Sequence, residues 1–170
     1  QLAWTPAYYQ NMNDKNYARI DNDIALIMKI LLVCALFLIM FGKEIGMLLA
    51  KSNFHSALFI VPVIVIALII YAYYTFYSWH IQYAKKNIYM TPIVVVAGAV
   101  SISLNMIFIP KYGYVAAPFA SCGAYLTMLL MAMFVSKRIL RFHTTPISKL
   151  SKPLLIMISF VFIYYILMFM

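Results

Sequence analysis

Long apolar stretches separated by short polar breaks dominate the pattern of the chain. A helix rises about 1.5 Å per residue, so stretches of this length cross the roughly 30 Å of hydrocarbon in a bilayer. Apolar and polar positions do not alternate as they would in barrel strands. The pattern therefore predicts an all-α, multi-pass transmembrane bundle of about five spans. The stretches cover residues 22–41 (interrupted by Lys29), 56–79, 87–110, 112–136 and 153–170.

Proline and glycine mark where the predicted spans begin, bend and end. Pro110 cannot continue a helix interior, and Gly113 supplies the permissive backbone of a tight turn. We therefore expect the third span to end at Pro110 and the chain to re-enter the membrane at once. Pro92 and Pro118 are expected in the first turns of their helices, where the missing N–H costs little. Pro62 is expected about two turns into its helix, where it would introduce a kink.

Composition places the chain among integral membrane proteins. Hydrophobic residues make up 66% of the 170 residues and charged residues 10%, whereas a soluble domain carries about 25% charged residues. The mean hydropathy of +0.93 agrees. The first residues lack the pattern of a signal peptide. We interpret residues 1–21 as a cytoplasmic segment that follows a preceding span, and the sequence as a late part of a longer protein.

Basic residues predict the direction of the spans. The segment 137–152 holds five Lys and Arg without an acid, and Lys85 and Lys86 occupy another short break. The positive-inside rule places both breaks in the cytoplasm, so the turn before Gly113 and the segment 43–55 face outward. The net charge of +9 is explained by this topology and by attraction to anionic lipid, and not by nucleic-acid binding. Aromatic residues near the span ends are expected to form an interfacial belt: Tyr71, Tyr73, Tyr74, Tyr77, Trp79, Tyr83, Tyr112 and Tyr114.

The sequence offers no pattern for catalysis. His55, His80 and His143 lie in breaks or at span ends, without an acidic partner at helical spacing. No metal-ligand spacing and no glycine-rich phosphate loop occurs. We therefore expect a protein that is not an enzyme and that needs no metal or cofactor.

The polar residues inside the spans are the candidate binding residues. Lys29 lies about two turns into the first span, where an ionisable residue is a functional candidate because its burial in lipid is costly. If it faces a cavity, it would attract an anionic group such as a pyrophosphate; alternatively, it extends to the cytoplasmic interface on its long stem. Ser101 and Asn105 are four residues apart and share a helix face. They favour a hydrogen bond between helices, with contact to a sugar hydroxyl as the alternative.

The order of these features resembles the C-terminal part of the polysaccharide-export flippases, within the multidrug/oligosaccharidyl-lipid/polysaccharide exporter superfamily. The resemblance extends over essentially the whole chain. It rests on the stretches FGKEIGMLLAKSNFHSALFIVPVIV and YAKKNIYMTPIVVVAGAVSISLNMIFIPKYGYVAAPFASCGAY. Its main residues are the Ala3–Pro6 segment AWTP, Lys85, Lys86, Asn105, Ile109, Pro110, Gly113, Ala116, Ala117 and Tyr125.

The resemblance implies a fold and a function. Two six-helix lobes would enclose a cavity that opens alternately to each side of the bacterial cytoplasmic (inner) membrane. A polyprenyl-diphosphate-linked oligosaccharide, destined for O-antigen lipopolysaccharide or capsule, would cross from the inner to the outer leaflet. Residues 22–136 would supply four spans of the second lobe, residues 137–152 a basic cytoplasmic loop and residues 153–170 an additional span. The implied partners are the lipid-linked oligosaccharide, membrane lipids and other membrane proteins of polysaccharide assembly.

Three alternatives stay open. A multidrug or cation antiporter of the same superfamily would be expected to place acidic residues in its spans. A membrane-embedded polysaccharide polymerase or acyltransferase would need reactive polar residues or a large loop. A non-transporting assembly subunit would need none of these features, and the sequence does not distinguish such a subunit from a transporter.

Overall fold

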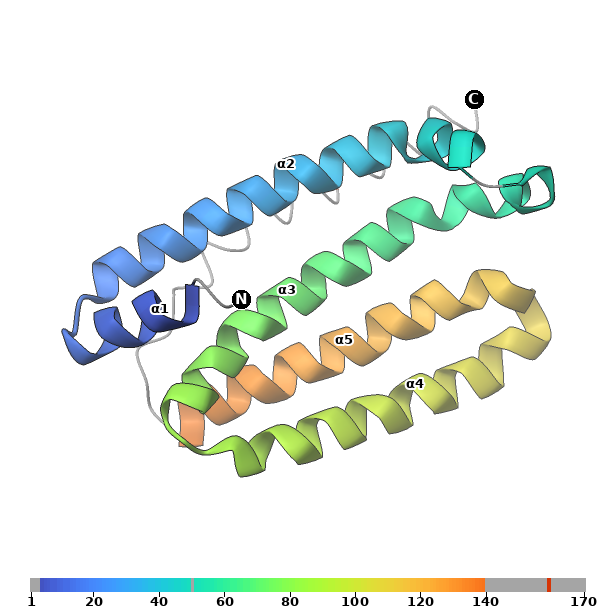
Figure 1. Cartoon of the computed structure of the whole chain (residues 1–170). Helices are drawn as coiled ribbons and strands as arrows, with labels where there is room; N and C mark the ends of the chain where they lie inside the picture. The colour runs from blue at the N-terminus through green and yellow to red at the C-terminus, as the bar shows by residue number, and fades with distance from the viewer. Residues whose placement is uncertain (1–3, 50, 140–158, 160–170) are drawn as a thin grey trace.

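The computed structural model describes residues 4–49, 51–139 and 159, and this part of the chain is helical without a strand. Figure 1 shows the arrangement of its helices. The α-helices are α1 (Trp4–Asn13), α2 (Tyr17–Leu49), α3 (Val61–Tyr83), α4 (Met90–Tyr112) and α5 (Ala116–Phe134). Short 3₁₀ turns connect them, η1 (Ser52–Ile60), η2 (Asn87–Tyr89) and η3 (Gly113–Val115), and a π-helical turn, η4 (Val135–Ile139), follows α5. The predicted all-α class is confirmed.

Three helical stretches in the described residues are long and apolar enough to cross a membrane. They are Tyr17–Leu49, Ala57–Tyr83 and Asn87–Arg138. The third stretch folds back on itself at Gly113 and contains both α4 and α5. A bundle of helices that fit a membrane is therefore confirmed, whereas five separate spans and two lobes stay predictions. The span predicted at 153–170 lies outside the described residues, apart from Ser159.

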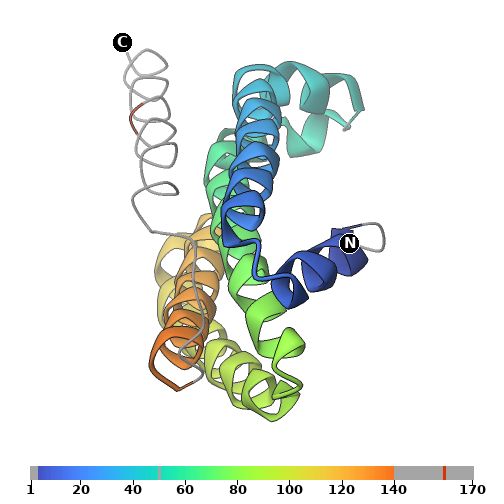
Figure 2. The ribbon, with the colours of Figure 1, turned by 90° about the vertical axis from the view of Figure 1, so that its left-hand side faces the viewer.

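The helices form a single layer, in which the neighbours α3 and α5 run in the same direction. α3 packs against α2 on one side and against α5 on the other, and α4 packs against the far side of α5. The order across the layer is therefore α2, α3, α5, α4, with α2 and α4 at its edges, as Figures 1 and 2 show. Successive helices run in opposite directions because each connection is short. We call the end that carries α1 the near end, and the end that carries Gly113 the far end.

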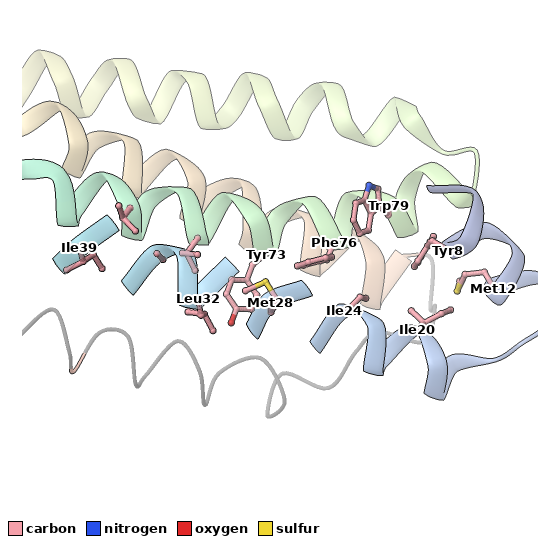
Figure 3. Close-up of a cluster of buried hydrophobic side chains, with 13 residues drawn as sticks. Tyr8, Met12, Ile20, Ile24, Met28, Leu32, Ile39, Tyr73, Phe76 and Trp79 are labelled. Carbon is pink, nitrogen blue, oxygen red and sulfur yellow. The ribbon is translucent and has the colours of Figure 1, made fainter. Parts of the chain in front are cut away.

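The packing of α2 against α3 follows from the spacing of apolar residues along α2. Its buried positions recur every three or four residues, as a helix that buries one face requires. Figure 3 shows this stripe against Tyr73, Phe76 and Trp79 of α3. The buried positions are Ile20, Asp21, Ile24, Met28, Leu32, Ala35, Ile39 and Gly42.

The first predicted span is longer in the structure than its apolar stretch. α2 begins at Tyr17 and ends at Leu49, so it includes the first part of the segment 43–55, which is predicted to be a break between spans. Its 33 residues correspond to about 50 Å, more than the roughly 30 Å of hydrocarbon. A helix of this length would extend past the hydrocarbon layer on crossing a membrane.

The turn between α4 and α5 is set by Gly113, and our expectation that Pro110 ends the helix is wrong. Pro110 lies inside α4, which ends at Tyr112. Proline fits there because its fixed φ is helical and only one hydrogen bond is lost, in the last turn. Gly113 has φ 64° and ψ −153°, a backbone region that is essentially restricted to glycine.

The other prolines in the described helices lie in first turns. Pro92 and Pro118 are the third residues of α4 and α5, as predicted. Pro62 is the second residue of α3, so the predicted kink is wrong. The reason is that α3 begins at Val61, whereas the apolar stretch already begins within η1.

Much of the predicted interfacial belt is instead part of the core. Tyr73, Tyr74, Tyr77 and Trp79 are all 4–8% exposed. They lie on α3, the inner helix of the layer, which has neighbours on both sides. In contrast, Tyr112 and Tyr114 at the far end are 66% and 56% exposed, as a belt requires. Hydropathy alone does not separate these two groups of aromatic residues.

α1 is held against the near ends of α2 and α3. Tyr8 and Met12 are buried, and Tyr8 packs against Trp79 with 5.9 Å between the ring centroids. Tyr9 contacts Tyr83 at 5.7 Å. The Tyr83 hydroxyl also donates a 2.7 Å hydrogen bond to Oδ1 of Asn13. α1 projects to one side of the layer (Figure 2), so it is docked through this aromatic contact and does not extend the layer.

Candidate functional site

Lys29 lies on the exposed side of α2. Its neighbour Met28 is 1% exposed and faces α3, whereas Lys29 is turned away from this contact. The side chain of Lys29 is exposed in the described structure. The exposed position of Lys29 is compatible with a cavity that other parts of the protein would close. It is equally compatible with an ammonium group that extends to the membrane interface.

Ser101 and Asn105 are adjacent on α4, as their spacing predicts. Nδ2 of Asn105 lies 3.5 Å from Oγ of Ser101, which makes a long hydrogen bond within one helix. Both side chains are half-buried. Oδ1 of Asn105 is buried and has no hydrogen-bond partner among the described residues. The described helices therefore provide a hydrogen-bond partner for Nδ2 of Asn105 but not for Oδ1.

The structure does not bring the predicted binding residues together. Lys29 lies on α2 and the Ser101–Asn105 pair lies on α4, at opposite edges of the layer (Figure 1). α3 and α5 separate the two edges. One small ligand could contact both groups only if other parts of the protein closed the layer into a ring around a cavity.

Asp21 is buried in the described structure, although its polar sequence context did not predict this. It is 6% exposed and lies on the buried stripe of α2, between Ile20 and Ile24. We had placed it in a polar segment before the first span. Helical spacing was the available signal, because Asp21 precedes Ile24 by three residues and Met28 by seven.

His80 is the second polar residue that the sequence analysis undervalued. It is 3% exposed in the last turn of α3, and its Nδ1 lies 2.8 Å from the carbonyl oxygen of Phe76. Since a carbonyl only accepts, Nδ1 is the nitrogen that donates this hydrogen bond. The ring packs edge-on against Tyr8 at 5.7 Å and stacks on Tyr77 at 6.1 Å.

Two tyrosine hydroxyls beside His80 are buried. The hydroxyls of Tyr8 and Tyr77 have no hydrogen-bond partner among the described residues. Burial raises the pKa of Tyr8 well above its ordinary value, and the neighbouring Tyr9 and Tyr83 raise this pKa further. The near end of α3 is therefore a tightly packed aromatic contact in which the neutral form of Tyr8 is favoured.

The charge around the helices is one-sided. No Asp or Glu follows Glu44 in the sequence, so every charged residue on α3, α4, α5 and their connections is basic. Lys85 and Lys86 lie at the near end and are exposed, and Lys137 and Arg138 follow α5 at the same end. Lys111 lies at the far end. In the parts that the structure describes, no group of three or more His, Cys, Asp or Glu could hold a metal ion.

Comparison with models of protein families, with curated proteins and with solved structures gives no match for this chain.

Proposed function

We propose that the chain is part of a transporter that moves a polyprenyl-diphosphate-linked oligosaccharide across the bacterial cytoplasmic membrane by alternating access. In this proposal α2 to α5 and the segment 153–170 are five spans, and the near end faces the cytoplasm. The observation that carries the proposal is the open layer of helices. α4 has only Ile93 and Ala97 buried along its whole length, so most of its surface is open to lipid or to further helices of a lobe.

The chemistry of the substrate supports a protein-lined path. A sugar head and a diphosphate cannot cross hydrocarbon unaided, because each polar group without a hydrogen bond costs several kcal/mol there. Spans that surround a cavity can replace water with polar side chains and with positive charge. Lys29 at one edge of the layer, and the Ser101–Asn105 pair at the other, would face such a cavity if a second layer closed it.

The packing of the layer is compatible with a rocking motion of lobes. α4 and α5 approach closely where Gly123 meets Leu104, since a Cβ at Gly123 would lie 2.6 Å from Cδ1 of Leu104. Small residues at such contacts allow helices to pack as a stable unit in lipid. Alternating access needs units that move as bodies around a shared site.

Deletion of the gene in the bacterium that encodes the protein tests the proposal. We expect a deletion to abolish surface polysaccharide and to cause lipid-linked oligosaccharide to accumulate in the cytoplasmic leaflet. Normal surface polysaccharide in the deletion strain would contradict the proposal.

The role of Lys29 is tested by substitution in the full chain. We expect Lys29→Ala to reduce export and Lys29→Arg to restore it, at equal amounts of protein in the membrane. Lys43→Ala is the matched control, because Lys43 is an exposed lysine on the same helix, near the far end of α2. Full export by Lys29→Ala would remove Lys29 from the binding site and leave the transport proposal standing.

The burial of Asp21 favours a cation-coupled antiporter of the same superfamily as the second candidate. Such a transporter needs an acidic residue in a span, and Asp21 is a buried carboxylate on the helix α2. In this case Asp21→Asn, which keeps the shape of the side chain, would abolish cation-driven efflux of a dye from vesicles. The same variant would leave surface polysaccharide unchanged.

A further inference from the structure

A groove separates the far halves of α3 and α5. Its cavity volume is about 410 Å³. Small side chains line part of it, among them Ala67 of α3 and Ala117 of α5. Larger residues form its walls: Ile60, Ile64, Leu68, Tyr114, Pro118 and Tyr125.

The described residues that line the groove favour a hydrocarbon chain over a sugar. None of them is charged. The hydroxyl of Ser121 donates to the carbonyl oxygen of Ala117 at 3.1 Å, so its proton is already used within α5. The ring of Tyr125 packs against Tyr71 at 5.1 Å. A sugar would leave most of its hydroxyls without partners here, which is costly in an apolar site.

The position of the groove points to the bilayer as the source of its occupant. Both walls belong to helical stretches that are long and apolar enough to cross a membrane. The exposed Leu68, at 52%, shows that the groove opens to the outside of the layer. In a membrane this opening faces lipid, so a lipid chain can enter sideways without leaving hydrocarbon.

The charge near the mouth of the groove selects the headgroup. Tyr114 marks the far-end mouth, and the exposed Lys111 precedes it by three residues. Among the described residues of this end, Glu44 on α2 is the one acid, beside Lys43 and Lys51, and α3, α4 and α5 carry no carboxylate. A lysine near the membrane surface attracts an anionic headgroup by about 1 kcal/mol.

We propose that this groove binds one hydrocarbon chain of an anionic phospholipid, with the lipid phosphate beside Lys111. The inference does not depend on the proposed transport function. The bound chain fills the space that the small residues leave between α3 and α5, and it thereby stabilises the far half of the layer.

Native mass spectrometry of the purified full chain tests the site with two probes, phosphatidylglycerol and phosphatidylcholine. We expect the affinity for phosphatidylglycerol to exceed the affinity for phosphatidylcholine by about five-fold. This ratio corresponds to the attraction of about 1 kcal/mol between Lys111 and an anionic headgroup. Ala117→Phe should abolish the retention by filling the groove, and Lys111→Gln should remove the preference for phosphatidylglycerol. Ala99→Phe is the matched control, because Ala99 is an exposed alanine on α4. Equal retention of the two lipids by the unaltered chain would overturn the proposal, as would full retention by Ala117→Phe.

A fluorescence measurement keeps the test valid if Ala117→Phe fails to fold. In a background with both native tryptophans replaced by Phe, Leu68→Trp places a reporter in the groove and Val95→Trp places one on the exposed face of α4. Vesicles of phosphatidylcholine would contain a minor fraction of phosphatidylglycerol brominated on its chains. Stronger quenching at position 68 than at position 95 supports the site, and equal quenching overturns it. Loss of the stronger quenching on addition of polyprenyl phosphate would overturn the assignment to a phospholipid.

Discussion

Gly42 of α2 lies directly against Val61, the first residue of α3. A Cβ at position 42 would lie 2.9 Å from Cγ1 of Val61. One turn later, Gly46 faces Leu58 at an even closer approach. These two glycines, four residues apart, allow the far ends of α2 and α3 to meet, as small residues at this spacing do in membrane helices.

This contact predicts that Gly42→Val destabilises the protein by about 1–3 kcal/mol, the usual cost of overpacking. The branched side chain of Val61 has little rotamer freedom to move away. Gly98→Val is the matched control, because a Cβ at Gly98 meets nothing within 4 Å. Unfolding of both variants in mixed detergent gives the comparison. Equal loss of stability in the two variants would contradict the packing described for Gly42.

The turn at Gly113 predicts a backbone effect that is independent of packing. A Cβ at Gly113 has open space, but its φ of 64° strains any other residue. We therefore expect Gly113→Ala to lower the free energy of unfolding by about 1–3 kcal/mol. Thermal unfolding measures the loss, with Gly98→Ala as the control at another open position. An unchanged midpoint for Gly113→Ala would mean that the turn adopts a different backbone conformation.

The docking of α1 should weaken at alkaline pH. The pKa of Tyr8 is raised in the folded state, first by burial and then by Tyr9 and Tyr83. The neutral Tyr8 side chain therefore contributes to stability below the pKa of an unfolded tyrosine, about 10. This contribution is lost as the pH rises above that value. The fluorescence of Trp79 reports this loss in a Trp4→Phe background, because Trp79 packs against Tyr8.

Tyr8→Phe is the control for this pH dependence. Its stability at neutral pH should equal that of the unaltered chain or exceed it by about 1 kcal/mol, since the buried hydroxyl has no described partner. The alkaline transition of Trp79 fluorescence should shift to higher pH in this variant. The same transition in both proteins would assign it to another tyrosine.

The proposed orientation predicts opposite labelling at the two ends of the layer. Lys85 and Lys111 are both exposed and lie at the near and far end. With Cys34 and Cys122 replaced by Ser, a membrane-impermeant thiol reagent added to intact cells should label Lys111→Cys and spare Lys85→Cys. The reverse pattern would invert the proposed topology and would place the basic near end outside the cell.

The sequence alone determined the helical class, the membrane-compatible stretches, the turn near Gly113 and the first-turn prolines Pro92 and Pro118. These features depend on local properties, namely apolar length and the backbone limits of proline and glycine. Only the tertiary structure decided that Tyr73 is a core residue, that Asp21 and His80 are buried, and that Lys29 lies at the opposite edge from Asn105. Burial and proximity depend on which helices become neighbours, and hydropathy along one segment does not contain that information.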